Sequence, residues 1–189
     1  MSERYVPKKL KVHYRILTQP NFPAIDMLNN ANDIYNDLNI SVDLVSNIRL
    51  VNVAPEQMKH RIVRKDCTFG MQITNQESEL YNYNRNYKDI KVVPREVVVY
   101  FISDMTPEGS MTPKGWGCTY RNFAKASVII VKNAHSYVLA HELGHMLSLI
   151  EHSDDRTNLM HADNPFNGKP NLRQDQIETI VKSTYLWTK

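Results

Sequence analysis

Two histidines and a glutamate stand close together in the segment AHELGH, residues 140–145, and five of the 7 histidines of the chain lie between residues 135 and 161. His141 and His145 are four residues apart, so on a helix their rings project from one face about one turn apart, as two ligands of one metal ion must. Glu142 lies one position round the helix and can take a proton from a metal-bound water. This spacing predicts a zinc site that performs hydrolysis.

A further histidine, His152, follows the segment and is a candidate third ligand, because imidazole suits zinc. On a continuous helix, however, His152 would lie about 16 Å from His141 along the axis. It can bind the same ion only if the chain leaves the helix after about Ser148 and folds back. We expect Leu149, Ile150 or a neighbouring residue to make this turn.

The region resembles the active site of the metzincin zinc peptidases, whose motif is HExxHxxGxxH followed by a turn with an invariant methionine. The resemblance rests on a short set of residues: His141, Glu142, His145, His152 and the sequence NLM at 158–160. The stretch LRQDQIETI, residues 172–180, is also similar to the C-terminal helix of matrix-metalloproteinase-like members. The order of the expected elements is similar to theirs as well.

The chain departs from that motif at two positions. The glycine of the family falls at Ser148 and its third histidine at Glu151, so His152 stands one residue late. His152 is the favoured third ligand and Glu151 the leading substitute. His161 and Asp155 are weaker candidates.

The resemblance also implies roles for residues around the metal. Met160 would lie beneath the ion as a packing floor, in a Met-turn. A peptide substrate would lie extended along an edge strand, for which 115–122 is the candidate. The side chains expected to contact substrate come from this segment and from the chain after Met160: Trp116, Tyr120, Asn164, Pro165 and Phe166. Trp116 and Tyr120 have an alternative role as ordinary packing aromatics.

Hydrophobic periodicity predicts the elements that position these residues. Strands are expected at 9–18, 42–53, 97–102 and 126–131, and helices at 21–38, 136–150 and 172–185. The order of strand, helix, strands and helices favours an α/β (α+β) fold, a metzincin-like zincin with a mixed twisted sheet, an active-site helix and a C-terminal helix. Residues 67–91 show no clean period and are expected to form a long irregular segment.

Two details of the helices are expected from the sequence. In the active-site helix, apolar residues opposite the histidines would bury the helix in the core: Leu139, Leu143, Leu147 and Ile150. In the last helix, Asn171 is the expected N-cap, with Gln174 three residues further on.

Composition narrows the class of protein. Hydrophobic residues make up 42% of the 189 residues and charged residues 23%, as in a folded globular chain, and we expect one catalytic domain over residues 1–189. The net charge of +3 is spread along the chain and does not indicate a nucleic-acid partner. The sequence has no run of 18 apolar residues, so we expect no membrane span. The two cysteines, Cys67 and Cys118, could form one disulfide, and the sequence does not decide whether they do.

The sequence thus favours a zinc-dependent endopeptidase, a monomer with one catalytic Zn²⁺, that cuts internal peptide bonds with a zinc-bound water activated by Glu142. Two alternatives stay open: an inactive or structural zinc-binding interaction module, and a zinc amidase acting on a non-protein amide. Glu142 argues against a structural site, which needs no base. No signal peptide is visible at the N-terminus. We expect a secreted or delivered protein rather than a cytoplasmic one.

Overall fold

A computed structural model describes residues 6–52, 54–55, 61–64, 74–107, 116–162 and 168–188. Its helices are α1 (Ala24–Tyr35), the 3₁₀ helix η1 (Asn36–Leu38), α3 (Asn75–Asn82), α4 (Val138–Met146) and α5 (Gln174–Val181). Its strands are β1 (Lys8–Ile16), β2 (Ile40–Arg49), β3 (Arg61–Arg64), β4 (Val97–Ile102), β5 (Asp104–Pro107), β6 (Gly117–Tyr120), β7 (Ser127–Val131) and β8 (Trp187–Thr188).

The main sheet has the order β2-β1-β4-β7-β6, and the short strand β8 pairs with the start of β1. The pairs β1–β2, β1–β4 and β4–β7 are parallel, whereas β6 runs antiparallel to β7 and forms one edge of the described sheet. Strands β4 and β7 are buried along their whole length, as parallel strands covered on both faces must be. The mixed α/β fold predicted from the sequence is confirmed.

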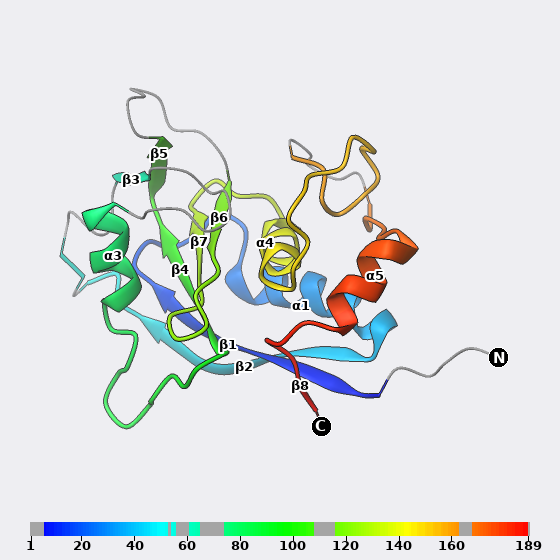
Figure 1. The fold of residues 1–189 in the computed structure, drawn as a ribbon. Coiled ribbons are helices and arrows are strands. Elements are labelled where there is room, and N and C mark those ends of the chain that lie inside the picture. The colour runs from blue at the N-terminus through cyan, green and yellow to red at the C-terminus, as the bar shows by residue number, and fades with distance from the viewer. Residues whose placement is uncertain are drawn as a thin grey trace.

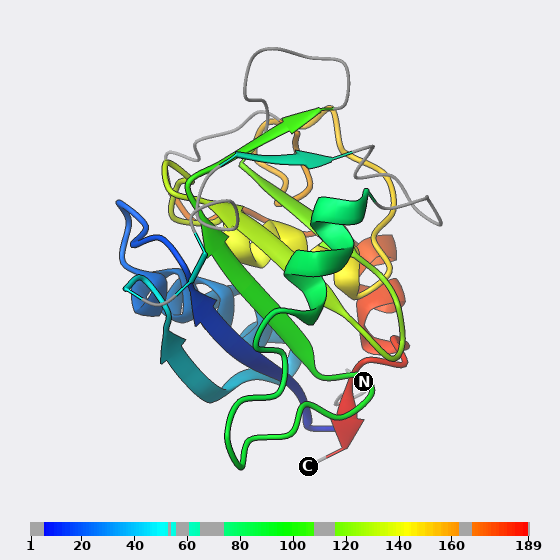
Figure 2. The same cartoon turned by 90° about the vertical axis from the view of Figure 1, so that its left-hand side faces the viewer.

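Helices cover the two faces of the sheet unequally. Helices α1, α4 and α5 lie on one side, and α3 lies on the other, as two perpendicular views show (Figures 1 and 2). Helices α1 and α4 pack against each other, and the buried Tyr35 hydroxyl donates to the Ala140 carbonyl at 2.7 Å. Helix α4 also packs against the edge strand β6. The predicted active-site helix is therefore held between α1 and the edge of the sheet.

The predicted elements are present, with shorter bounds in most cases. Helix α4 spans nine residues instead of the 15 expected from periodicity, because the chain turns away from the helix axis after Met146. Helix α5 begins at Gln174, not near Asn171. The side-chain oxygen of Gln176 accepts a hydrogen bond from the Arg173 N–H at the start of α5, so the N-cap expected at Asn171 was wrong.

The irregular segment expected at 67–91 contains a helix. Helix α3 begins with a complete capping box, in which the Thr74 hydroxyl accepts from the Glu77 N–H at 3.1 Å and the Glu77 carboxylate accepts from the Thr74 N–H at 2.8 Å. Such reciprocal bonds satisfy donors that the first helical turn leaves unpaired. The TNQE sequence at 74–77 carries this signal, which hydrophobic periodicity does not contain.

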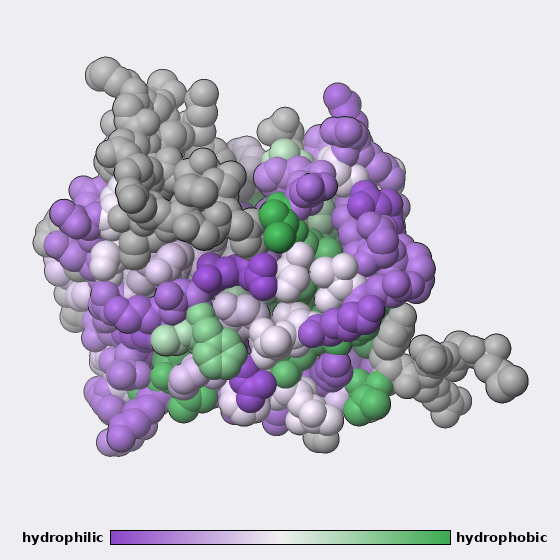
Figure 3. Space-filling model, viewed as in Figure 1, coloured by the Kyte–Doolittle hydropathy of each residue, from purple (hydrophilic) through white to green (hydrophobic). Residues whose placement is uncertain are grey.

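Among the described residues on the face seen in Figure 3, hydrophilic side chains predominate and apolar side chains gather in small separate groups. None of the described helices has the length and hydropathy needed to cross a membrane.

Candidate metal centre

The turn after α4 brings His152 back towards the helix. The Ser148 N–H donates to the His145 carbonyl at 3.1 Å, and the Leu149 N–H donates to the Gly144 carbonyl at 3.0 Å. These two bonds, with Ser148 at a φ of 85°, form the Schellman arrangement that commonly ends helices. A left-handed residue at this point is usually glycine.

The left-handed turn lies at Ser148 itself, where the metzincin motif has its glycine. The Ser148 hydroxyl accepts a hydrogen bond from Arg121 at 2.9 Å, which ties the turn to the segment just after β6. Because the chain leaves the helix here, Ile150 is 56% exposed. The expectation that Ile150 faces the core was wrong, whereas Leu139, Leu143 and Leu147 are buried as expected.

Three histidines meet at the end of α4. One ligand atom from each of His141, His145 and His152 lies within 4.8 Å of the others, and no other group of potential metal ligands is found in the described part of the chain. The Nε2 atoms of His145 and His152 are 3.3 Å apart. The ring centroids are 4.8 to 5.3 Å from one another. The structure thus brings together the three histidines predicted as ligands. They include His152, which lies one residue later than the third histidine of the metzincin motif.

Main-chain carbonyls fix the orientation of two of these rings. His141 Nδ1 lies 2.8 Å from the Leu159 carbonyl, and His145 Nδ1 lies 2.6 Å from the Leu149 carbonyl. A carbonyl can only accept, so each Nδ1 carries the proton and each Nε2 presents its lone pair. Zinc-binding histidines commonly have such a partner on the second nitrogen. The arrangement sets both rings in the tautomer that binds metal through Nε2.

The protonation state of these rings also suits a metal. Burial, then the neighbouring charge of His145, lowers the pKa of His141 to about 3. Burial is also the main cause that lowers the pKa of His145 to about 4. Both imidazoles are therefore neutral near pH 7, and only a neutral imidazole can donate its lone pair.

The donor set matches zinc in type, and one of its ligand pairs matches zinc in spacing. A tetrahedral ion with Zn–N distances of about 2.0–2.1 Å keeps its nitrogen ligands about 3.3 Å apart. The His145–His152 separation of 3.3 Å meets this value. Three imidazoles with no fourth protein ligand in the group are typical of catalytic zinc sites, which leave one position open.

The alternative third ligands do not join the group. Glu151 is exposed and Asp155 accepts from the N–H and hydroxyl of Thr157, both at 2.8 Å. His161 is likewise outside the group of three. Among the described residues, His152 is the one that completes the set.

Glu142 lies between α4 and the edge strand. Its side chain is 5% exposed, and its Oε2 accepts a hydrogen bond from the Thr119 hydroxyl at 2.7 Å. The same hydroxyl lies 2.8 Å from the Glu142 carbonyl. The predicted base is therefore held in place by a residue of β6, a contact that the sequence alone did not suggest.

The segment after the histidines packs beneath α4. Met160 is fully buried, and a Cβ added at Gly144 would stand 2.6 Å from the Met160 sulfur. The absence of a side chain at Gly144 thus lets Met160 approach the helix between its two histidines. Asn158 anchors this segment, because its amide exchanges hydrogen bonds with Gln176 of α5 at 2.8 and 3.1 Å.

The expected substrate contacts divide into three groups. Trp116 is 40% exposed and its ring meets that of His135 edge-on at 5.9 Å. Tyr120 stacks on Tyr81 with ring centroids 4.9 Å apart, which favours the packing role over substrate contact. Asn164, Pro165 and Phe166 lie outside the described residues.

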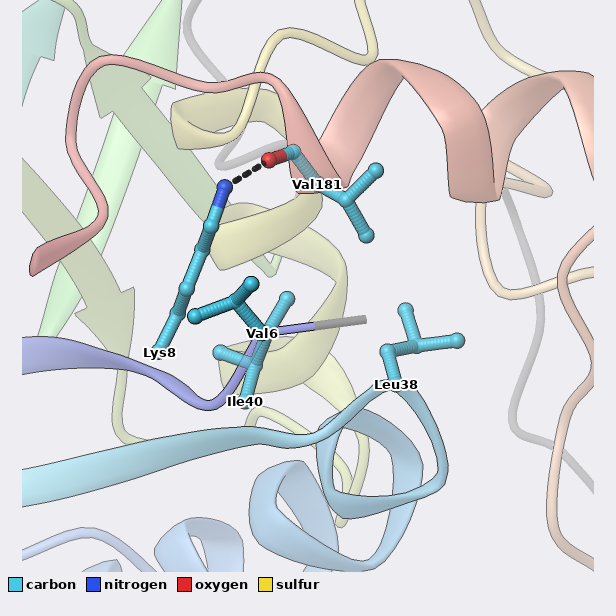
Figure 4. Close-up of a pocket in the computed structure, with 5 residues that line it drawn as sticks. All are labelled: Val6, Lys8, Leu38, Ile40 and Val181. Carbon is cyan, nitrogen blue, oxygen red and sulfur yellow. Dashed lines mark hydrogen bonds between the residues drawn. The ribbon is translucent and has the colours of Figure 1, made fainter. Parts of the chain in front are cut away.

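Of the two cysteines, Cys118 is buried in β6 and disulfide-bonded, and Cys67 lies outside the described residues. A small pocket elsewhere, of about 120 Å³, is lined by Val6, Lys8, Leu38, Ile40 and Val181 (Figure 4). Its one amine, Lys8 Nζ, donates to the Val181 carbonyl. With apolar walls and a lysine already engaged, this pocket offers no catalytic group.

Two residues at the centre, Gly117 and Thr119, were not identified from the sequence, although the segment that contains them was expected to be the edge strand. Alternation along the expected edge strand could have placed Gly117 and Thr119 on one face. Alignment with the metzincin motif pointed to Ser148, but its left-handed conformation is visible only in the structure.

Solved structures similar to this chain in fold include metalloproteinases. The chain is similar to the crystal structure of metalloproteinase-II from Bacteroides fragilis, with a TM-score of 0.67, 16% identity, and coverage of 96% of this chain but 55% of that one. It is also similar to archaemetzincin from Methanopyrus kandleri, with a TM-score of 0.52, 16% identity and coverage of 91% and 93%. No protein-family model and no curated protein matches the sequence. The chain therefore has a metalloproteinase-like fold and a three-histidine cluster in it.

Proposed function

We propose that this protein is a zinc-dependent endopeptidase of the metzincin type. The observation that carries the proposal is the convergence of His141, His145 and His152, next to a buried glutamate, in a fold found in metalloproteinases. One Zn²⁺ would be held by these three imidazoles, and Met160 would form the floor of the site as a Met-turn.

The chemistry divides between the ion and the protein. Zinc supplies Lewis acidity, which makes a water molecule more acidic and polarises a carbonyl. Glu142 accepts a proton from the attacking water and then donates it to the nitrogen of the leaving amine. The oxygen of the water forms the new bond to the carbonyl carbon as the C–N bond breaks.

The substrate is expected to bind as an additional strand. The edge strand β6 is paired only with β7 among the described residues, so its outer side can pair with an extended peptide. Because β6 also contacts Glu142, a peptide paired there would have its backbone beside the base. A monomer suffices for this arrangement, since all the proposed groups come from one chain.

The test is digestion of a diverse peptide mixture by the zinc-loaded protein, with mass spectrometry of the products. Glu142→Gln should abolish internal cuts, because the amide cannot accept the proton. Glu151→Gln, an exposed neighbour of similar charge, is the matched control and should cut like the wild type. If the zinc-loaded wild type makes no internal cuts, that result would contradict an endopeptidase of broad specificity. It would favour the amidase or the interaction module.

A further inference from the structure

The edge strand β6 contacts Glu142 through two residues. Gly117 and Thr119 are two positions apart, so they face the same side of the strand, towards α4. Their neighbour Tyr120 stacks on Tyr81 on the opposite side. The strand thus turns its small and polar residues towards Glu142 and its aromatic residue away.

Gly117 gives the Glu142 side chain its space. A Cβ added at Gly117 would stand 2.6 Å from Glu142 Oε1, 2.7 Å from its Cγ and 2.8 Å from its Cδ. Contacts this close do not occur between real side chains, so even alanine at 117 would displace the carboxylate. The carboxylate therefore lies directly over the backbone of the strand.

Thr119 gives the carboxylate a donor. A buried carboxylate is costly unless it is hydrogen-bonded, and Glu142 is 5% exposed. The Thr119 hydroxyl lies 2.7 Å from Glu142 Oε2 and 2.8 Å from the Glu142 carbonyl. A hydroxyl can donate one hydrogen bond and accept others. When Glu142 is ionised, the Thr119 hydroxyl can donate to its carboxylate. When Glu142 is protonated, the hydroxyl can accept from the carboxylic acid and donate to the Glu142 main-chain carbonyl. The hydroxyl can therefore stay bonded to Glu142 whether or not the side chain carries a proton.

The position of Thr119 in the sheet is itself fixed. Thr119 is paired with Val128 of the fully buried strand β7, and Cys118 beside it is disulfide-bonded. Helix α4 is fixed independently by the Tyr35 hydroxyl on the Ala140 carbonyl. The hydrogen bond from Thr119 to Glu142 therefore joins two rigid elements, which is the condition for holding a side chain in one orientation.

We propose that Thr119 is a positioning residue for the base Glu142, with Gly117 providing the space in which the carboxylate is held. The role rests on the proposed peptidase function. Thr119 acts through Glu142 and does not touch the metal ligands, so it affects turnover and not zinc binding or substrate affinity.

The test compares Thr119→Val with Thr119→Ser in the zinc-loaded protein. Valine keeps the shape of threonine without the hydroxyl, so kcat should fall about 10- to 100-fold, the range expected for loss of one group supporting a catalytic residue. KM and zinc content should stay within about 2-fold, because neither depends on Glu142 orientation. Serine should restore kcat to within about 3-fold of wild type. Gly117→Ala should lower kcat with zinc still bound.

A measurement without turnover separates this proposal from the proposed function. Urea midpoints of Thr119→Val, Glu142→Gln and the double variant should be non-additive if the two side chains interact. Additive shifts, or a kcat that Thr119→Val leaves unchanged, would overturn the positioning role. Non-additive shifts in a protein that cuts no peptide would overturn the peptidase function and leave the Thr119–Glu142 contact standing.

Discussion

Two histidine environments in this molecule have opposite arrangements. At His13, on β1, both ring nitrogens meet protein groups: Nδ1 lies 2.9 Å from the Ser46 hydroxyl and Nε2 lies 3.0 Å from the Glu96 carboxylate. At the end of α4, main-chain carbonyls accept hydrogen bonds from the Nδ1 atoms of His141 and His145. One nitrogen from each of these rings and from His152 lies within 4.8 Å of the others.

The difference shows how the partners of a histidine decide its role. His13 is 0% exposed, and its hydrogen-bond network continues from the Glu96 carboxylate to the Lys11 amine, 3.0 Å away. Both nitrogens of the His13 ring therefore have protein partners. Such a satisfied network links β1 to β2 and to the residue that precedes β4, and it needs no ligand. The three imidazoles of the second group each bring a nitrogen to a common place, and a cation is the partner that suits all three at once. The first group is structural, and the second has the arrangement of a candidate metal centre.

The largest effect is expected from removing one of the converging histidines. His152→Ala should weaken zinc binding by more than about 100-fold, because loss of a ligand exceeds the 10- to 100-fold typical of an outer partner. Zinc affinity is measured by competition with a chromophoric chelator.

Glu151→Ala is the control for that experiment, since Glu151 occupies the position of the third ligand in the metzincin motif. It should bind zinc like the wild type. A reversal, with tight binding by His152→Ala and weak binding by Glu151→Ala, would assign the third ligand to Glu151.

The opposite result is expected at His13. His13→Ala removes one hydrogen-bond partner from each of the buried Glu96 and Ser46 and should lower the free energy of unfolding by about 1 to 3 kcal/mol. Glu96 keeps its ion pair with Lys11, and Ser46 keeps its hydrogen bond from Arg15. Zinc affinity of the folded variant should stay at the wild-type value. Urea denaturation of the zinc-free protein measures the first quantity, and a variant as stable as wild type would contradict a structural role for this network.

A smaller effect is expected at the turn that brings His152 to the site. Ser148 has a φ of 85°, so Ser148→Gly should relieve about 1 kcal/mol of strain, partly offset by loss of the hydrogen bond from Arg121. Ser148→Val should lower stability and zinc affinity together, because a β-branched residue resists this conformation. Thermal unfolding with and without zinc measures both, and a valine variant that binds zinc normally would contradict the role of the turn.

The smallest effect is a pH dependence of stability from the His13 network. Burial lowers the pKa of His13 below 6.5, although Glu96 opposes it. Burial alone would raise the pKa of Glu96, but hydrogen bonds from Lys11, the Val93 N–H and His13 lower it below 4.5 overall. Both folded-state pKa values are depressed, so the unfolded chain binds more protons and stability falls as the pH drops below about 6.5.

That dependence can be isolated by subtraction. The difference in unfolding free energy between wild type and His13→Ala should shrink between pH 7 and pH 5, because only the wild type loses the contribution of His13. A difference that grows on acidification would mean that His13 is charged in the folded protein.

Much of the fold and of the metal centre was predictable from the sequence, and the reason lies in periodicity. The i, i+4 spacing of His141 and His145 places two ligands on one helix face, and the apolar runs at 97–102 and 126–131 predict the buried strands that support that helix. Both signals come from local chain geometry, which the sequence contains directly.

What was not predictable depends on contacts between distant segments. The contact of Thr119 with Glu142 joins residues 23 positions apart, and its existence depends on how β6 packs against α4. The role of His13 likewise depends on Ser46 and Glu96, which lie 33 and 83 positions away. A hydrophobic pattern carries no information about such polar pairs, so the sequence predicted the cluster of histidines but not the groups that hold Glu142.

The three-histidine centre can be tested by X-ray absorption at the zinc edge of the zinc-loaded protein, with wild type beside His152→Ala. We expect one zinc per chain with three imidazole nitrogens and one further light ligand at about 2.0–2.1 Å, and a loss of one imidazole in any zinc that the variant retains. Four protein ligands, a sulfur ligand, or an unchanged imidazole count in the variant would contradict an open three-histidine centre.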